Sequence, residues 1–177
     1  MLNYDSVEEY IKKLKEIGWD LTPKTIILRG KELRVNLEDK IKEEFIINPK
    51  FAHKGLSVLS FRKDCVQHLG MYRILINLFS KASNGKFNPT KIRVLEDDYY
   101  FELEISFNLN NKNYYKELTF GEYFDDEFLD FINTCLKNIN EPKQFIKLPE
   151  NEEVINFVFV EREVYDKAVK EGLILNK

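Results

Sequence analysis

Polar and apolar side chains alternate between residues 91 and 120, and this pattern restricts the possible folds more than any other in the chain. In one run the apolar side recurs at every second position, at Tyr99, Phe101, Leu103, Ile105 and Phe107. A period of two is typical of a strand with one buried face. The Asn-Asn-Lys-Asn segment at 110–113 tolerates the left-handed backbone of a tight turn, and the alternation then resumes. We therefore predict an antiparallel hairpin over residues 99–120, preceded by a strand from about residue 91.

Helical spacing of apolar residues flanks this hairpin on both sides. It predicts helices over 7–17, from Asp64 to Asn84-Gly85 with Gly70 inside, from about 125 to 139, and from about 162 to 170. Further strands are expected at 25–28 and 33–37, which form a hairpin, and at 144–148 and 154–160; the last is apolar enough to be central in a sheet. The structure of residues 37–62 stays open, with a short helix over 37–47 as one possibility.

These elements predict an α+β fold with a largely antiparallel sheet and flanking helices. The C-terminal half reads strand, strand, strand, helix, strand, strand, helix. A chain of 177 residues with 44% hydrophobic side chains is long enough for one packed core. We expect a single domain over residues 1–177, with a less regular part at 1–90 and a regular α+β part at 91–177.

The cysteine content and the hydropathy pattern bear on the compartment. With 2 cysteines, no disulfide framework is implied, and reducing surroundings are the simpler assumption. The N-terminus lacks the basic and apolar regions of a secretory signal, and no apolar run approaches the roughly 18 residues that a membrane span needs. A cytoplasmic protein without a membrane partner is therefore expected.

Charge is divided very unevenly along the chain. Residues 96–130 hold eleven acids and two bases, whereas residues 1–95 carry a net charge of +7 and the whole chain only −3. The candidate binding residues come from this acidic region and combine carboxylates with tyrosines. They are Glu96, Asp97, Asp98, Tyr99, Tyr100, Tyr123, Asp125, Asp126 and Glu127.

Three interpretations of the acidic region remain open. It could be a metal or general acid/base site, although it has neither EF-hand spacing nor a paired catalytic signature. It could be a docking surface for a basic protein, with the tyrosines as anchors. It could also be a solvated face that serves solubility and the electrostatics of a helix terminus.

Other kinds of site have little support in the sequence. Cys65 and His68 form one close pair without the second pair of a closed zinc site, so we expect no metal and no cofactor. A Cys-His nucleophilic pair is conceivable because Cys65 would open a helix, but no orienting third residue stands out. Neither glycine-rich phosphate-binding motif occurs. Nucleic-acid binding is disfavoured by the pI of about 5.6 and by acids interspersed among the bases.

The C-terminal half resembles the small α+β immunity proteins that accompany bacterial polymorphic toxins. The resemblance lies in the layout of three segments: Asp97–Phe101, Phe128–Asn133 and Val164–Lys167 with Gly172–Ile174. It implies a cytoplasmic, non-enzymatic protein that binds one cognate toxin domain and blocks it. Such toxins are often nucleases with basic active-site surfaces, which an acidic face would fit.

The leading hypothesis from the sequence is therefore a non-catalytic inhibitor that docks a basic partner through an acidic surface bearing tyrosines. The resemblance implies a toxin nuclease domain as that partner. Two alternatives remain: a small enzyme with a Cys/His or carboxylate site, and an accessory or structural module of a mobile element. The oligomeric state is left open.

Overall fold

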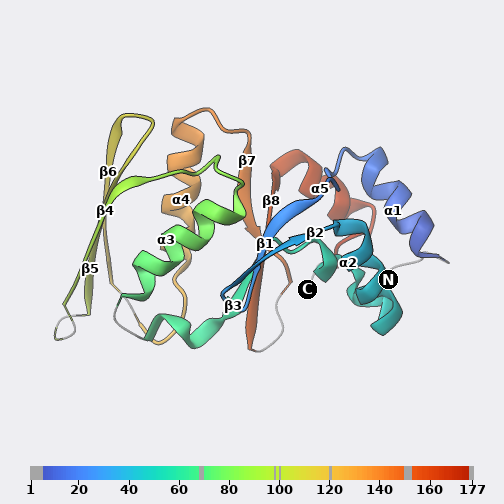
Figure 1. Cartoon of the computed structure of the whole chain (residues 1–177), viewed down its shortest axis with the longest axis horizontal. Helices are drawn as coiled ribbons and strands as arrows, with labels where there is room; N and C mark the ends of the chain where they lie inside the picture. Colours follow the sequence, from blue (N-terminus) through green and yellow to red (C-terminus); the bar gives the residue numbers. More distant parts are fainter. Residues whose placement is uncertain are drawn as a thin grey trace.

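A computed structural model describes residues 6–67, 70–97, 99, 101–119, 121–149 and 153–175. In these ranges β-sheets and helices stack in alternating layers along the long axis of the molecule (Figure 1). The elements in chain order are α1 (Val7–Glu16), β1 (Lys24–Leu28), β2 (Lys31–Val35), α2 (Leu37–Ile47), the 3-10 helix η1 (Pro49–Leu56), β3 (Leu59–Arg62), the 3-10 helix η2 (Lys63–Gln67), α3 (Met71–Ala82), β4 (Thr90–Asp97), β5 (Glu102–Leu109), β6 (Lys112–Thr119), α4 (Asp126–Asn138), β7 (Lys143–Lys147), β8 (Val154–Glu161) and α5 (Arg162–Lys170).

The layers follow from which faces are covered. A three-stranded sheet forms one end of the molecule, and α3 and α4 separate it from a five-stranded sheet; α1, α2 and α5 lie on the far side of that larger sheet (Figure 1). The fold class is α+β with largely antiparallel sheets, as the sequence predicts. Among the described residues, no helix is long and apolar enough to cross a membrane.

The five-stranded sheet has the order β2-β1-β3-β8-β7. Its pairs are antiparallel except β1 and β3, which run parallel, so their carboxyl ends lie at the same edge. The apolar strand β8 is an inner strand, in agreement with its sequence. Residues 37–62, which the sequence left open, supply α2, η1 and the central strand β3.

Helix α2 and η1 pack against each other at a glycine. A Cβ atom on Gly55 would lie 2.6 Å from the Cα atom of Ile41, inside the distance that real Cβ atoms keep. His53, in the same 3-10 helix, is buried and 1% exposed. This segment therefore needs glycine at position 55 for packing.

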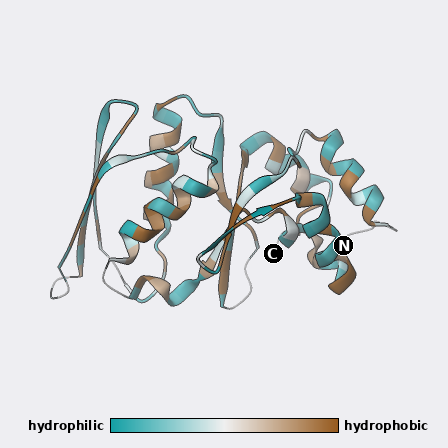
Figure 2. Ribbon diagram, in the orientation of Figure 1, coloured by the Kyte–Doolittle hydropathy of each residue, from teal (hydrophilic) through white to brown (hydrophobic). Residues whose placement is uncertain are grey.

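The three-stranded sheet is an antiparallel meander with the order β4-β5-β6. On its inner face Leu103, Ile105, Phe107 and Leu109 are buried against the helix layer. Hydrophobic segments, brown in Figure 2, concentrate on the inner strands and on the helices between the sheets. The middle of that core is aromatic, and Phe79 of α3 contacts the rings of Phe124, Phe128, Phe145 and Phe157.

The structure corrects the predicted helix from Asp64 to Asn84-Gly85. Gly70 is the N-cap of α3 and has a left-handed backbone with φ of 81°, so it lies outside the helix that was predicted to contain it. Residues 63–67 form a 3-10 helix instead, in which Asp64 binds the Arg62 side chain. The apolar spacing was correct for α3, but the glycine sits where its positive φ is used.

The structure also corrects the start of the predicted hairpin. Strand β5 begins at Glu102, whereas Tyr99 and Phe101 lie in the connection from β4 and are 82% and 57% exposed. Phe101 has φ of +55°, which extended strand backbone does not permit. The alternation therefore predicted the strand correctly but extended it three residues too far toward the N-terminus.

Candidate functional site

The outer face of the β4-β5-β6 sheet is the candidate site. Its side chains point away from α3 and α4, and this sheet is the outermost layer at its end of the molecule (Figure 1). Four carboxylates occupy neighbouring positions on it: Asp97 opposite Glu102, and Glu104 opposite Glu117. We call these four residues the acidic face.

The Glu104–Glu117 pair places two like charges directly across two strands. Such cross-strand pairs are unfavourable in an isolated sheet. Glu117 accepts a hydrogen bond from the Tyr115 hydroxyl at 2.6 Å, and this bond raises the pKa of Tyr115 to about 12. The tyrosine therefore remains a neutral donor at physiological pH and holds the Glu117 carboxylate in place.

A hollow of about 290 Å³ lies at the acidic end of the sheet. Its lining combines residues of both faces of the sheet with the first turn of α4: Glu102, Glu104, Glu117 and Thr119, the inward-facing Leu103 and Leu118, and Glu127. The sheet and the start of α4 therefore contribute to one negative surface. A compact cationic group such as the end of a lysine or arginine side chain has the size and charge for this hollow.

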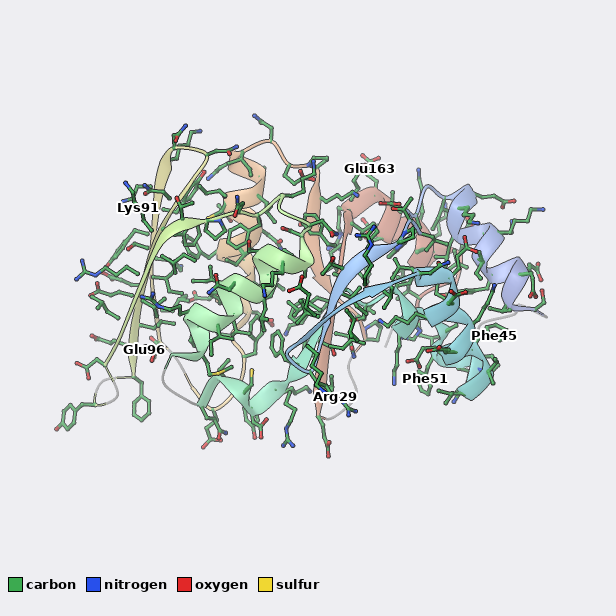
Figure 3. All side chains as sticks on the ribbon, viewed as in Figure 1. Arg29, Phe45, Phe51, Lys91, Glu96 and Glu163 are labelled. Carbon is green, nitrogen blue, oxygen red and sulfur yellow. The ribbon has the colours of Figure 1, made fainter. Side chains whose placement is uncertain are left out.

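Apolar side chains flank the acidic face. On the sheet itself, Leu95 is 46% exposed and Tyr115 52% exposed, while Tyr99 and Phe101 lie in the adjoining turn. The opposite end of the same sheet is different, because Arg93 projects from its outer face and Lys91 is exposed nearby. Figure 3 places Lys91 and Glu96 toward opposite ends of β4.

Glu96 does not belong to the exposed surface that the sequence predicted. It alternates with its neighbours onto the inner side of β4, where its Oε2 accepts a hydrogen bond of 2.8 Å from the backbone N–H of Gly70. This contact ties β4 to the N-terminal end of α3, whose dipole favours a carboxylate there. Its role in the structure is to join an edge strand to a helix.

The predicted residues near α4 also have local structural roles. Asp125 is the N-cap of α4, with its Oδ1 accepting from the Glu127 backbone N–H at 2.8 Å. Asp126 forms an ion pair with Lys147 of β7, which directs it toward the larger sheet. Tyr123 is 61% exposed and Glu127 reaches the hollow, so these two remain available at the surface.

The remaining predicted residues lie in the β4–β5 connection. Asp97 is exposed and accepts a hydrogen bond at its Oδ1 from the Tyr99 backbone N–H at 2.9 Å, which shapes the turn. Asp98 and Tyr100 lie outside the described residues. Of the predicted residues, Asp97, Tyr99 and Glu127 thus lie at the same end of the three-stranded sheet.

Sequence reasoning omitted Glu102, Glu104 and Glu117 from the candidate set, although they form most of the acidic face. The signal was present, because Glu102 and Glu104 alternate with the buried Leu103 and Ile105. Glu117 could not be added from periodicity alone. Its position opposite Glu104 depends on the hairpin register, which follows from the turn at Asn110-Asn111.

The cysteines do not form an activated nucleophile. Burial, assisted by the nearby charge of Asp64, raises the pKa of the Cys65 thiol to about 11. Burial likewise raises the pKa of Cys135 to about 12. His68, the predicted companion of Cys65, lies outside the described residues. Within the described part of the chain, no group of three or more His, Cys, Asp or Glu side chains is arranged to hold a metal ion.

Comparisons with protein families and individual proteins give no further guide to the function. No family model, no curated protein and no solved structure matches this chain. The function therefore has to be inferred from the geometry and charge of the acidic face itself.

Proposed function

We propose that this protein is a non-catalytic binding protein that docks a basic protein partner on the acidic face. The observation that carries the proposal is the direct opposition of Glu104 and Glu117 on an uncovered sheet surface. Repulsion between them weakens the isolated sheet, and a lysine or arginine from a partner would relieve it. Binding of a basic ligand would therefore stabilise this surface, because the ligand's positive charge offsets the repulsion between the two carboxylates.

The surroundings of the acidic face fit a protein partner better than a small cation. The exposed side chains of Leu95, Tyr99 and Tyr115 adjoin the carboxylates. Aromatic and aliphatic anchors of this kind supply much of the binding energy in protein interfaces, whereas charges steer the encounter. A partner with a basic patch that includes apolar residues is the expected complement.

We further propose that the partner is a toxin domain and that the protein acts as its immunity inhibitor. This step rests on the resemblance of the C-terminal half to immunity proteins of bacterial polymorphic toxin systems. A nuclease toxin would present the required basic surface, since such enzymes bind the phosphate backbone. Occupation of that surface by the acidic face would exclude the nucleic acid.

The proposal is tested by affinity capture from the native host with three forms of the tagged protein. The forms are the wild type, the double variant Glu104→Lys/Glu117→Lys, and a control, Asp39→Lys/Glu163→Lys, that changes the net charge equally. Asp39 and Glu163 are exposed and belong to α2 and α5, in the layer beyond the larger sheet. We avoid Asp125 and Asp126 because their side chains cap α4 and bind Lys147.

The expected result is one stoichiometric basic protein that the wild type and the control retain and the double variant loses. Equal retention by the double variant would contradict docking on the acidic face. The immunity role is tested separately with the captured partner: its expression alone should arrest growth, and co-expression of the wild type should restore it. A harmless partner would contradict the toxin part and leave the docking surface standing.

A further inference from the structure

A second hollow lies where β1, β3 and α3 meet. Its volume is about 500 Å³, within the range of small-molecule sites. Its lining is mainly apolar: Phe61, Met71, Ile74, Leu75, Leu78 and Val154. We call it the α3 pocket. None of the four residues of the acidic face lines it.

The position of the α3 pocket follows from the topology of the larger sheet. Strands β1 and β3 run parallel, so their carboxyl ends lie at the same edge of the sheet. Arg29 directly follows β1 at this edge, and Arg62 is the last residue of β3. Ile74, on the α3 side of the pocket, is 48% exposed and so leaves apolar surface uncovered.

The charged rim of the α3 pocket is asymmetric. Arg62 donates two hydrogen bonds, of 3.1 and 3.0 Å, to the carboxylate of Asp64, and it also feels the charge of Glu153. The guanidinium of Arg29, in contrast, has no hydrogen bond or ion pair to another described side chain. The carboxylates of Asp64 and Glu153 thus compensate the charge of Arg62, whereas the positive charge of Arg29 is not compensated by a described side chain.

The backbone at Arg29 shows that the turn itself does not favour this residue. Arg29 and Gly30 have φ of 51° and 75°, and Leu28 pairs with Lys31, which together define a two-residue turn of the I′ type. Asn, Asp or Gly suits the first central position of such a turn, whereas arginine is strained there. Figure 3 places Arg29 beside the β1–β2 hairpin. The turn conformation therefore does not account for an arginine at position 29, whereas a charged side chain at the rim of the α3 pocket would.

We propose that the α3 pocket binds an amphipathic carboxylate, with its hydrocarbon chain in the apolar hollow and its carboxylate on the Arg29 guanidinium. The planar fork of arginine matches the two oxygens of a carboxylate. Ile74 and the half-buried Met71, Leu78 and Val154 supply the accessible surface on which a medium-length chain loses its contact with water, and the buried Phe61 and Leu75 form the floor of the pocket. The proposal is independent of partner docking, because the two sites share no lining residue.

The test uses decanoate at concentrations below those at which it forms micelles, with binding followed by titration calorimetry. The ligand controls are decanol and decyltrimethylammonium, which keep the chain and change the head group. The protein variants are Arg29→Asn, which removes the charge and suits the turn, and Arg29→Lys, which keeps the charge. We expect saturable 1:1 binding of decanoate and at least tenfold weaker binding of the cationic ligand.

Arg29→Asn should raise the melting temperature and weaken decanoate binding at least tenfold, while Arg29→Lys should weaken it less. Cys65 offers a local readout because it also lines the α3 pocket. Decanoate should slow alkylation of Cys65 by N-ethylmaleimide in the wild type but not in Arg29→Asn, with the fully buried Cys135 as an internal reference. Absence of saturable binding, equal binding of the cation, or unchanged affinity in Arg29→Asn would each overturn the proposal.

Discussion

Glu104 of β5 and Glu117 of β6 face each other across the outer side of the three-stranded sheet, with their backbones in direct register. Both side chains are exposed, and Glu117 is further held by the Tyr115 hydroxyl. The register of the two strands thus holds two negative charges next to each other. The pair therefore lowers the stability of the free protein.

Replacement of Glu104 by lysine should therefore stabilise the free protein. Glu104→Lys turns a repulsive cross-strand pair into an attractive one and keeps the hydrogen bond from Tyr115 to Glu117, so we expect the free energy of unfolding to rise by roughly 0.2–1 kcal/mol. Urea unfolding at low salt measures this change. Glu163→Lys on α5, with the same change in net charge, should give no increase. In addition, salt should stabilise the wild type more than Glu104→Lys, since ions screen the repulsion.

His53 predicts a loss of stability on acidification. Burial, with a contribution from the charge of Lys54, lowers the pKa of His53 to about 4 from its usual 6.5. Below pH 6.5 His53 becomes protonated in the unfolded chain but stays neutral in the folded protein. The free energy of unfolding therefore falls as the pH decreases toward 4. The slope from this group approaches about 1.4 kcal/mol per pH unit.

The comparison for this pH effect is His53→Gln, which removes the titrating ring. The difference in unfolding free energy between wild type and variant should shrink steadily from pH 6.5 to pH 4, while carboxylates elsewhere cancel in the difference. A difference that stays constant over this range would show that His53 titrates normally in the folded protein.

Gly55→Ala should destabilise the packing of η1 on α2. The new Cβ would lie 2.6 Å from the Cα of Ile41, and backbone atoms cannot yield as a flexible side chain can. Strain of this kind costs typically 1–3 kcal/mol, and we expect at least that loss in chemical denaturation. Gly121→Ala is the matched control because its Cβ would meet nothing within 4 Å. Equal effects of the two substitutions would contradict the close approach.

Glu96→Ala should loosen the N-terminal end of α3. The substitution removes the 2.8 Å hydrogen bond from the Gly70 backbone N–H and the favourable charge at the helix terminus. A loss of about 1–2 kcal/mol is expected, because hydrogen bonds to charged groups contribute more than neutral ones. Amide hydrogen exchange at Gly70 should accelerate, whereas exchange on α4 should not. Unchanged exchange at Gly70 would show that Glu96 does not hold this helix end.

Cys65 should behave as an unactivated thiol. With its pKa raised to about 11, little thiolate is present at pH 7, and iodoacetamide should alkylate it more slowly than free cysteine. The rate should continue to increase with pH beyond the range in which free cysteine has become fully ionised. Fast alkylation at neutral pH would instead revive the Cys/His enzyme alternative.

The sequence predicted most elements of the fold because their periodicity is strong and local. The alternation of Leu103, Ile105 and Phe107 and the helical spacing of α4 each indicate one buried face without knowledge of the rest of the chain. The errors occurred where backbone conformation decided the outcome. Gly70 and Phe101 both have positive φ, and neither value follows from the hydrophobic pattern.

The candidate site was predicted as a region but not as a set of side chains. Counting charges located the acidic segment, yet Glu96 and Glu104 differ only in the face on which each strand places them. Glu96 turned inward to Gly70, while Glu104 turned outward to Glu117. The order β2-β1-β3-β8-β7, and hence the α3 pocket, depends on pairing between distant segments that local patterns do not encode.

The position of β3 between β1 and β8 has a consequence for synthesis of the protein on the ribosome. Phe157 of β8 pairs with Leu59 of β3, so one edge of β3 waits for a strand made almost a hundred residues later. The β4–β6 meander is complete in sequence long before that strand appears. Until then the N–H and C=O groups along this edge of β3 are unpaired. Such an edge can pair with a wrong strand unless a chaperone covers it. A chain that ends before residue 154 would thus lack β8 and leave one edge of β3 unpaired, and an unpaired edge favours aggregation.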